Sequence, residues 1–306
     1  MTHEAVSTHV ETPAATIDTR IRQIVSNIRN LPTPPVVFHQ IQKVISDPNA
    51  SAAQVAAILG EDPAMSVKVL KLTNSVFYGL AREVESVKQA VVVVGMEAIK
   101  NLVLSASVLD MFKGNTLDQE RQERFWRHSL ATAFCSRLIA RSVRDRGMID
   151  PDSAFSAGLL HDVGKLVIEC FLAQEYAKFA AVRCDNVTAT DLEIERETLG
   201  YTHDHLGGFL AMQWKLPQRL GDAIAFHHSP TAAPAPELLA CIVHSGNFVA
   251  KHTFYGREDQ HLIGHPDPEA LAKLGIDEGR LEGFADKLRD EYAKAETFMQ
   301  MLGLTG

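Results

Sequence analysis

Apolar residues recur at helical spacing through almost the whole chain, and this periodicity limits the fold more than any other feature. Between Ile17 and Ile28 they follow the pattern i, i+4, i+7, i+8 and i+11, which places them on one face of a helix. Only the valine run at 91–94 is strand-like, because β-branched residues favour strands. A possible capping box before it, formed by Ser86 and Gln89, favours a short buried helix instead. The sequence therefore predicts an all-α fold.

Helix start signals and polar breaks divide this pattern into segments. Ser51 and Gln54 form a second possible capping box, and Asp62 stands before a proline suited to the first helical position. The prolines of LPTPP, which begins at residue 31, cannot continue a helix. The polar stretch KGNTLD at 113–118 separates two halves. We therefore expect a flexible leader at 1–16, an N-terminal helical subdomain at 17–115 and a second helical subdomain at 116–306.

The adjacent pair His161 and Asp162 lies in an otherwise apolar stretch of the second half. After a long predicted helix at about 119–146, the sequence Asp150-Pro151 begins the next helix, and the pair falls in its middle. A buried carboxylate is costly without a partner. A metal ion and a salt bridge to Lys165, one helical turn later, are the two alternatives.

Four further histidines fall on neighbouring predicted helices or at their ends, namely His128, His203, His227 and His228. Imidazole and carboxylate groups are ligands of iron, manganese, nickel and zinc, and helical bundles gather such ligands in their cores. With His161 and Asp162 they would hold one or two divalent ions, and the Asp162 carboxylate could bridge two of them. Isolated histidines such as His39, His244 and His252 are expected to be hydrogen-bonded or at the surface.

Charge and composition exclude several other classes. The formal charge of −8, with no large cluster of lysine and arginine, disfavours nucleic acid as a partner. No apolar run reaches the roughly 18 residues that span a bilayer, and the first residues lack an export signal. The four cysteines show no C-x-x-C spacing, which favours reduced thiols. We expect a cytoplasmic protein without membrane or nucleic-acid partners.

Five segments resemble a known family. HDVGK at 161–165 resembles the H-D-x-G-K motif of the HD superfamily of metal-dependent phosphohydrolases. LPTPPVVFHQI, DPAMSVKVLKLTNSVFYG, VESVKQAVVVVGMEAIKNLVL and LGYTHDHLGGFLAMQWKLPQRLGDAIAFHH resemble the HD-related output domain, HDOD, a bacterial signal-transduction module. The resemblance covers about 31–228. It implies an N-terminal helical bundle packed on an HD-like helical half.

The resemblance also implies roles for individual residues. Lys165 would be the motif lysine, which lies near substrate phosphate in catalytic relatives. His203 rather than His205 stands where the pattern H-x-x-x-G places its histidine. The metal ligands that the resemblance implies are His128, His161, Asp162, His203, His227 and His228.

Two departures from the catalytic pattern shape the functional hypothesis. Catalytic HD proteins carry an aspartate in a V-H-x-A-D context, where this chain has Asn247 in VHSGNFVA, and a neutral amide is a poorer ligand. The cyclic-di-GMP phosphodiesterase branch, HD-GYP, carries G-Y-P after its paired histidines, where this chain reads HHSPTAAPAP.

These departures favour a regulatory output module of bacterial signal transduction. It would act through contacts of residues 17–112 with signalling proteins, and its HD site would be metal-capable but catalytically degenerate. The alternative is a metal-dependent phosphohydrolase or phosphodiesterase acting on a nucleotide or phosphate ester, with Asp162 and Lys165 as catalytic residues. A third hypothesis is a scaffold without metal, in which hydrogen bonds satisfy His161 and Asp162.

Overall fold

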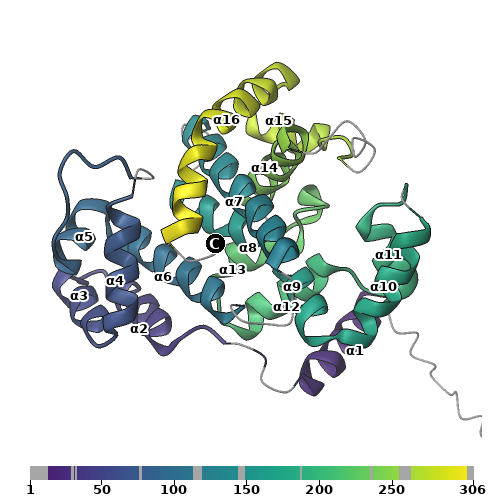
Figure 1. Cartoon of the computed structure of the whole chain (residues 1–306), viewed down its shortest axis with the longest axis horizontal. Coiled ribbons are helices and arrows are strands. Elements are labelled where there is room, and N and C mark those ends of the chain that lie inside the picture. Colours follow the sequence, from purple (N-terminus) through teal and green to yellow (C-terminus); the bar gives the residue numbers. More distant parts are fainter. Residues whose placement is uncertain are drawn as a thin grey trace, which may run out of the picture.

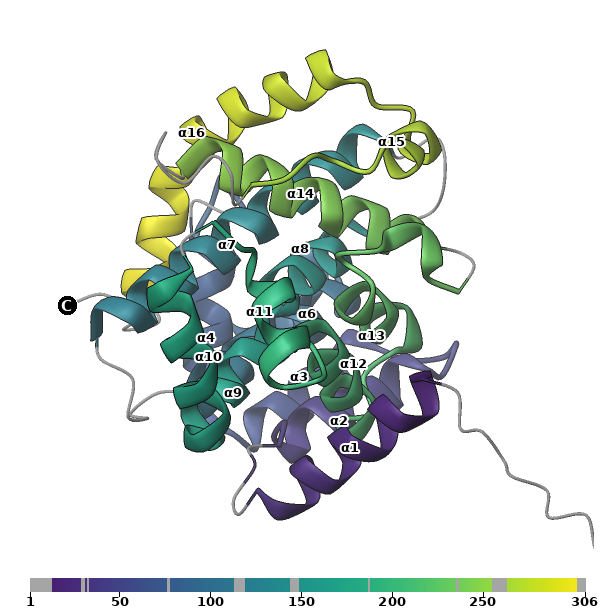
Figure 2. The ribbon, with the colours of Figure 1, turned by 90° about the vertical axis from the view of Figure 1, so that its right-hand side faces the viewer.

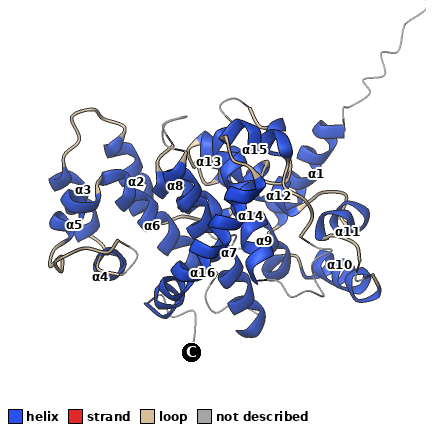
Figure 3. Ribbon diagram, turned by 90° about the horizontal axis from the view of Figure 1, so that it is seen from above, coloured by secondary structure: helices blue, strands red, loops and turns tan. Residues whose placement is uncertain are grey.

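The computed structural model of the chain describes residues 13–28, 31, 33–75, 78–112, 119–143, 149–186, 188–234, 237–254 and 263–301. Every regular element within these ranges is a helix (Figure 3), so the prediction of an all-α fold is confirmed. Among the described helices none is by itself long and apolar enough to cross a membrane; α5 and α6 reach that length and composition only as a pair bent by 116°. The four cysteines are free.

The N-terminal bundle consists of α2 (Val36–Ile45), α3 (Ala52–Gly60), α4 (Pro63–Thr73), α5 (Val87–Val94) and α6 (Met96–Met111). The predicted start signals are confirmed. Ser51 and Gln54 form a capping box, and the Asp62 carboxylate accepts a hydrogen bond from the backbone of Met65 at 2.9 Å. The Ser86 hydroxyl caps α5, so the valine run at 91–94 is helical.

The HD half begins with α7 and contains all the helices that follow it in the chain. They are α7 (Gln119–Ser142), α8 (Pro151–Leu160), α9 (Val163–Phe171), α10 (Ala173–Asp185), α11 (Asp191–Thr198), α12 (His203–Gln213), α13 (Gln218–Ala225), the 3₁₀ helix η2 (Pro230–Ala232), α14 (Leu238–Phe254), α15 (Pro268–Leu274) and α16 (Glu278–Met301). Helix α7 packs along α8 and α14 at the centre of this half, and α6 contacts α8 as well as α2, α4 and α5. Helix α6 therefore joins the two halves, as Figure 1 shows.

A buried ion pair stands where the two halves meet. The Arg137 side chain, 8% exposed on α7, lies 3.0 Å from the Asp152 carboxylate at the start of α8. The Tyr78 ring, from the segment between α4 and α5, lies 5.2 Å from the Arg137 guanidinium. This contact ties the N-terminal bundle to the two helices that lead to His128 and His161.

The structure differs from the sequence-based prediction at the beginning of the N-terminal region. Helix α1 (Pro13–Asn27) includes residues 13–16, which were assigned to the flexible leader; residues 1–12 lie outside the described residues. Helix α1 packs on α12 of the HD half, along the edge opposite α16 (Figure 2), and Arg22 lies over the Phe209 ring. The predicted break at 113–118 lies outside the described residues, and the boundary at 115 stays a prediction.

One local prediction is wrong: His161 and Asp162 do not lie in the middle of a single helix. They form a turn between α8 and α9, because Asp162 leaves the helical conformation, with φ −97° and ψ 12°. The apolar pattern continues through the turn without a proline, so the sequence carries no breaking signal. The turn places the two side chains at the end of one helix and the beginning of the next.

Candidate metal centre

The structure brings all six predicted ligands together from four parts of the HD half. His128 lies on α7, the His161–Asp162 pair in the turn after α8, His203 at the first position of α12, and the pair 227–228 in the turn after α13. They form two donor groups in which one ligand atom of each residue lies within 4.8 Å of the others. The first group is Asp162, His203, His227 and His228, and the second is His128, His161 and Asp162.

Asp162 belongs to both groups because its two carboxylate oxygens face in different directions. Oδ1 lies 3.0 Å from His203 Nε2 and 3.5 Å from His227 Nε2. Oδ2 lies 3.4 Å from His161 Nε2 and 3.6 Å from His128 Nε2. The side chain is only 2% exposed, so the carboxylate is surrounded by imidazole rings rather than water.

The expected salt bridge to Lys165 is also present. Lys165 Nζ lies 2.9 Å from Asp162 Oδ2 and 3.4 Å from Asp191 Oδ2. Arg183 contacts Asp191 as well. The predicted salt bridge is therefore confirmed for Oδ2, whereas the contacts described for Oδ1 are with His203 and His227.

Backbone carbonyls determine which ring nitrogens face the centre. His161 Nδ1 donates to Gly158 O at 2.7 Å, and His227 Nδ1 donates to Ile224 O at 2.8 Å. In the neutral form of either ring Nε2 would carry no proton and would meet the Asp162 carboxylate as one acceptor facing another. Among the described residues His227 Nε2 and Asp162 Oδ1 are buried without a hydrogen-bond partner. An unpaired buried polar atom costs about 1–3 kcal/mol, and a cation between these atoms would satisfy both. These residues fit a metal ion.

Glu195 orients His203 and was missed by the sequence analysis. His203 Nδ1 lies 2.9 and 2.8 Å from the two Glu195 oxygens, and the His203 backbone N–H donates to the same carboxylate at 2.8 Å. Metal-ligating histidines usually have a carboxylate or carbonyl partner of this kind. Burial lowers the pKa of His203, but the Glu195 charge outweighs it and the pKa rises to about 9. Without a cation, His203 Nε2 would therefore carry a proton directed at Asp162 Oδ1.

His128, His161 and Asp162 hold the protonation states that metal binding requires. Burial lowers the pKa of His128 to about 3 and that of His161 well below its usual value, so both rings are neutral near pH 7. Burial alone would raise the pKa of Asp162, but the charges of Lys165 and His203 hold it well below its usual range. Ionised carboxylate and neutral imidazole are the ligating forms.

A cavity of about 220 Å³ opens beside the first donor group. Its walls include His203, His228, Lys165 and Asp191. Asn247 also lines it from α14; the side chain is 5% exposed and its Oδ1 has no hydrogen-bond partner among the described residues.

Two other histidines lie near the cluster but outside both donor groups. His205 Nδ1 contacts the Thr202 hydroxyl at 2.8 Å, and the residue lines a different cavity, with Arg22 and Phe209. His244 Nδ1 donates to His227 O at 2.8 Å, so this isolated histidine is hydrogen-bonded, as expected, and helps to hold the turn that carries the histidine pair.

Comparisons with known proteins agree with this arrangement. A crystal structure of an HDOD domain protein of unknown function from Geobacter sulfurreducens is similar, with a TM-score of 0.76 and 26% identity over 94% of this chain and 99% of that one. A Shewanella amazonensis SB2B protein provisionally named a phosphohydrolase has a TM-score of 0.71 and 25% identity, over 92% and 98%.

Sequence relatives lead to the same family. An uncharacterised protein of Treponema pallidum (strain Nichols) is 26% identical over 212 residues, which are 69% of this chain but only 40% of that protein's length. The family model of the HDOD domain matches residues 31–230. The match covers more than half of the chain and agrees with the predicted range of about 31–228. The chain belongs to the HDOD domain family.

Proposed function

We propose that this chain is a regulatory output module of bacterial signal transduction, and that its HD half holds a divalent metal ion without catalysing hydrolysis. The observation that carries the proposal is the composition of the donor groups: among the described residues Asp162 is the only carboxylate in either of them. Asn247, in the wall of the adjacent cavity, is neutral where the catalytic pattern has an aspartate.

Charge balance favours one ion over two. Two divalent ions would bring four positive charges to a pocket whose donor groups supply one negative charge, and uncompensated buried charge is costly. The first group, Asp162 with His203, His227 and His228, offers four donors, enough for a tetrahedral site. Iron, manganese, nickel and zinc all accept this mixed nitrogen and oxygen set. A bound ion would supply the positive charge that links α9, α12 and the turn after α13.

Exposed apolar residues support an output through protein contacts. Four valines are exposed on the N-terminal bundle: Val36 at the beginning of α2, Val67 on α4, and Val92 and Val93 on α5, which packs against α4. Apolar side chains of this kind are common in protein interfaces. The proposed partners are other signalling proteins, bound by the surface of α2, α4 and α5.

A second candidate function is a metal-dependent phosphohydrolase acting on a nucleotide or phosphate ester. The observation that favours it is the second donor group, His128, His161 and Asp162, which shares the Asp162 carboxylate with the first. Hydrolytic two-metal sites use such a bridge. In this reading Asp162 and Lys165 are catalytic, and Lys165 would bind a phosphoryl oxygen from its position in the wall of the cavity.

Hydrolysis assays decide between the two functions. The purified chain would be tested against phosphomonoesters, phosphodiesters and nucleotides with manganese or iron added, beside Asp162→Asn and the exposed control Asp286→Asn. We expect no turnover above the metal-only background in any of the three proteins. Turnover that disappears in Asp162→Asn and persists in Asp286→Asn would overturn the regulatory proposal in favour of the hydrolase.

A further inference from the structure

Helix α14 directs a second residue, Lys251, into the cavity beside the histidine cluster. Asn247 and Lys251 are four residues apart, so they lie on the same face of the helix, and both line the cavity with His203 and His228. Neither residue belongs to the donor groups. Helix α14 therefore places an amide group and an ammonium group next to the histidine cluster.

Lys251 differs from the other lysine in the cavity because no direct ion pair with a carboxylate is described for it, although Asp191 lines the same cavity. Lys165 lies between the carboxylates of Asp162 and Asp191, and Asp191 is also paired with Arg183. Lys251 forms no ion pair with any described carboxylate. Burial and the nearby charge of Lys165 lower the pKa of Lys251, and they outweigh the opposite effect of the Asp162 and Asp191 charges.

We propose that Lys251 makes this cavity a binding site for a compact oxyanion of the size of inorganic phosphate. An oxyanion only accepts hydrogen bonds, and Lys251 offers three N–H donors, while the amide group of Asn247 offers two more from the next turn of α14. The anion would give Lys251 a direct ion-pair partner, while Lys165 and Arg183 already pair with the Asp191 carboxylate in the cavity wall. It would lie beside His228 and Asn247, the neutral residue that stands where the catalytic pattern has an aspartate.

The size of the cavity sets the size of the ligand. Its volume of about 220 Å³ is below the range of about 300–1,000 Å³ that holds drug-sized ligands. A phosphate or another small oxyanion fits this space, whereas a cyclic dinucleotide does not. The inference rests on the proposed function in one respect: if the chain is a regulatory module, the bound anion acts as a signal and not as a substrate.

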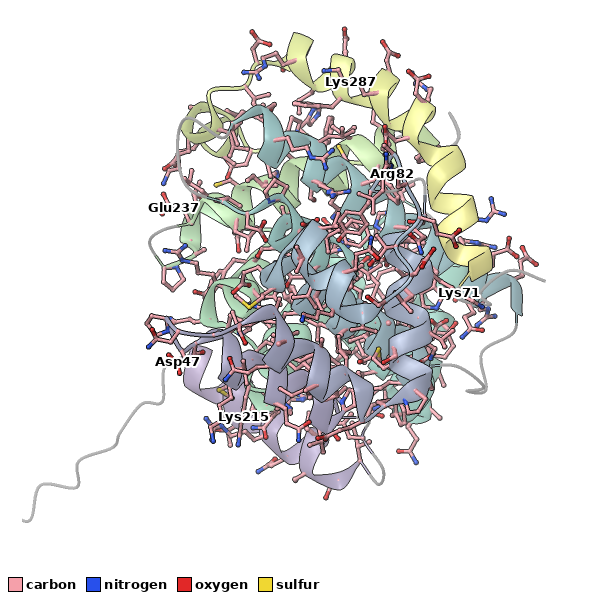
Figure 4. The ribbon with its side chains drawn as sticks, turned by 90° about the vertical axis from the view of Figure 1, so that its left-hand side faces the viewer. Asp47, Lys71, Arg82, Lys215, Glu237 and Lys287 are labelled. Carbon is pink, nitrogen blue, oxygen red and sulfur yellow. The ribbon has the colours of Figure 1, made fainter. Side chains whose placement is uncertain are left out.

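Calorimetric titration of the full chain with inorganic phosphate tests the inference, with cyclic di-GMP as the large comparison ligand. The variants are Lys251→Met, which removes the charge and keeps the length, and Lys251→Arg, which keeps a charge. Lys287→Met is the control, because Lys287 projects from α16 at the edge of the molecule (Figure 4). Circular dichroism and metal content are measured on every sample.

We expect the wild type to bind phosphate and not cyclic di-GMP. Lys251→Met should weaken phosphate binding by at least about tenfold, since a charge-assisted hydrogen bond is lost, while Lys251→Arg retains most of the affinity and Lys287→Met all of it. Three results would overturn the inference: no binding of millimolar phosphate by the wild type, unchanged binding by a folded Lys251→Met protein, or loss of phosphate binding only together with loss of metal. Lys251-dependent phosphate binding by a protein that never holds metal would instead contradict the proposed metal site.

Discussion

Gly164 packs directly on the backbone of His203. A Cβ atom at Gly164 would lie 2.0 Å from the carbonyl oxygen of His203, a distance that no side chain can occupy. The contact joins the first turn of α9, which follows Asp162, to the first turn of α12, where His203 stands. The 3.0 Å separation of Asp162 Oδ1 and His203 Nε2 therefore depends on a glycine at this position.

Replacing Gly164 by alanine should destabilise the protein and open the cluster. The added methyl group must push α9 away from α12, at a cost of about 3 kcal/mol, because the obstacle is backbone rather than a flexible side chain. Urea unfolding measures the loss. Gly283→Ala on α16 is the matched control, since nothing lies within 4 Å of its Cβ position, and it should stabilise the helix by about 0.5–1 kcal/mol. Equal stabilities for the two variants would show that the close approach of α9 and α12 is wrong.

Glu195→Gln should lower metal affinity by roughly 10–100-fold, since the carboxylate that orients and polarises His203 becomes a neutral amide. Competition with a chromophoric chelator measures the change. Glu197→Gln, two residues later on the same helix and exposed, is the control and should bind metal like the wild type. If Glu195→Gln keeps wild-type affinity, the carboxylate of Glu195 does not support a ligand.

His203→Ala and His205→Ala separate two neighbouring histidines of α12. His203→Ala removes a ligand from the four-donor group, so the variant should lose the ion. His205→Ala removes only the contact with the Thr202 hydroxyl and should retain the ion. Metal analysis of both proteins after gel filtration decides the point. The reverse pattern would mean that the ligand roles of these two histidines are exchanged.

Arg137→Met should destabilise the junction between the halves by about 3 kcal/mol, because it leaves the partly buried Asp152 carboxylate, 18% exposed, without its cation. Burial already raises the pKa of Asp152 in the presence of Arg137. Arg124→Met, which removes an exposed i,i+4 pair with Glu120 on the same helix, should cost less than about 1 kcal/mol. Urea unfolding measures the loss of stability in the two variants. A loss for Arg137→Met no greater than that for Arg124→Met would show that the ion pair does not stabilise the junction.

Much of the fold could be predicted because its signals are local. The caps at Ser51, Asp62 and Ser86 act on the next turn of their own helices, and the structure confirms each of them. The break at Asp162 could not be predicted in this way. The apolar pattern of α8 continues into α9, and the turn depends on the contact of Gly164 with α12, which is distant in sequence.

The candidate site shows the same division. His161 and Asp162 stand out in sequence as polar residues inside an apolar segment. The remaining histidines fall on neighbouring predicted helices, and the family resemblance implied the same six ligands. Glu195 carries no such signal, because it lies in DLEIERET, a helix that reads as an ordinary charged surface segment. Only packing reveals that its carboxylate is 3% exposed and holds His203. Lys251 likewise looked like one more basic residue near a helix end.

The metal content of the purified chain tests the central claim most directly. The protein would be expressed with iron, manganese, nickel and zinc in the medium, purified without chelators, and analysed by mass spectrometry of the elements beside Asp162→Asn and Asp286→Asn. We predict about one divalent ion per chain in the wild type and in Asp286→Asn, and almost none in a folded Asp162→Asn protein, which lacks the charge that the four-donor group requires. A wild type without bound metal, or an Asp162→Asn protein that retains a full ion, would contradict the account.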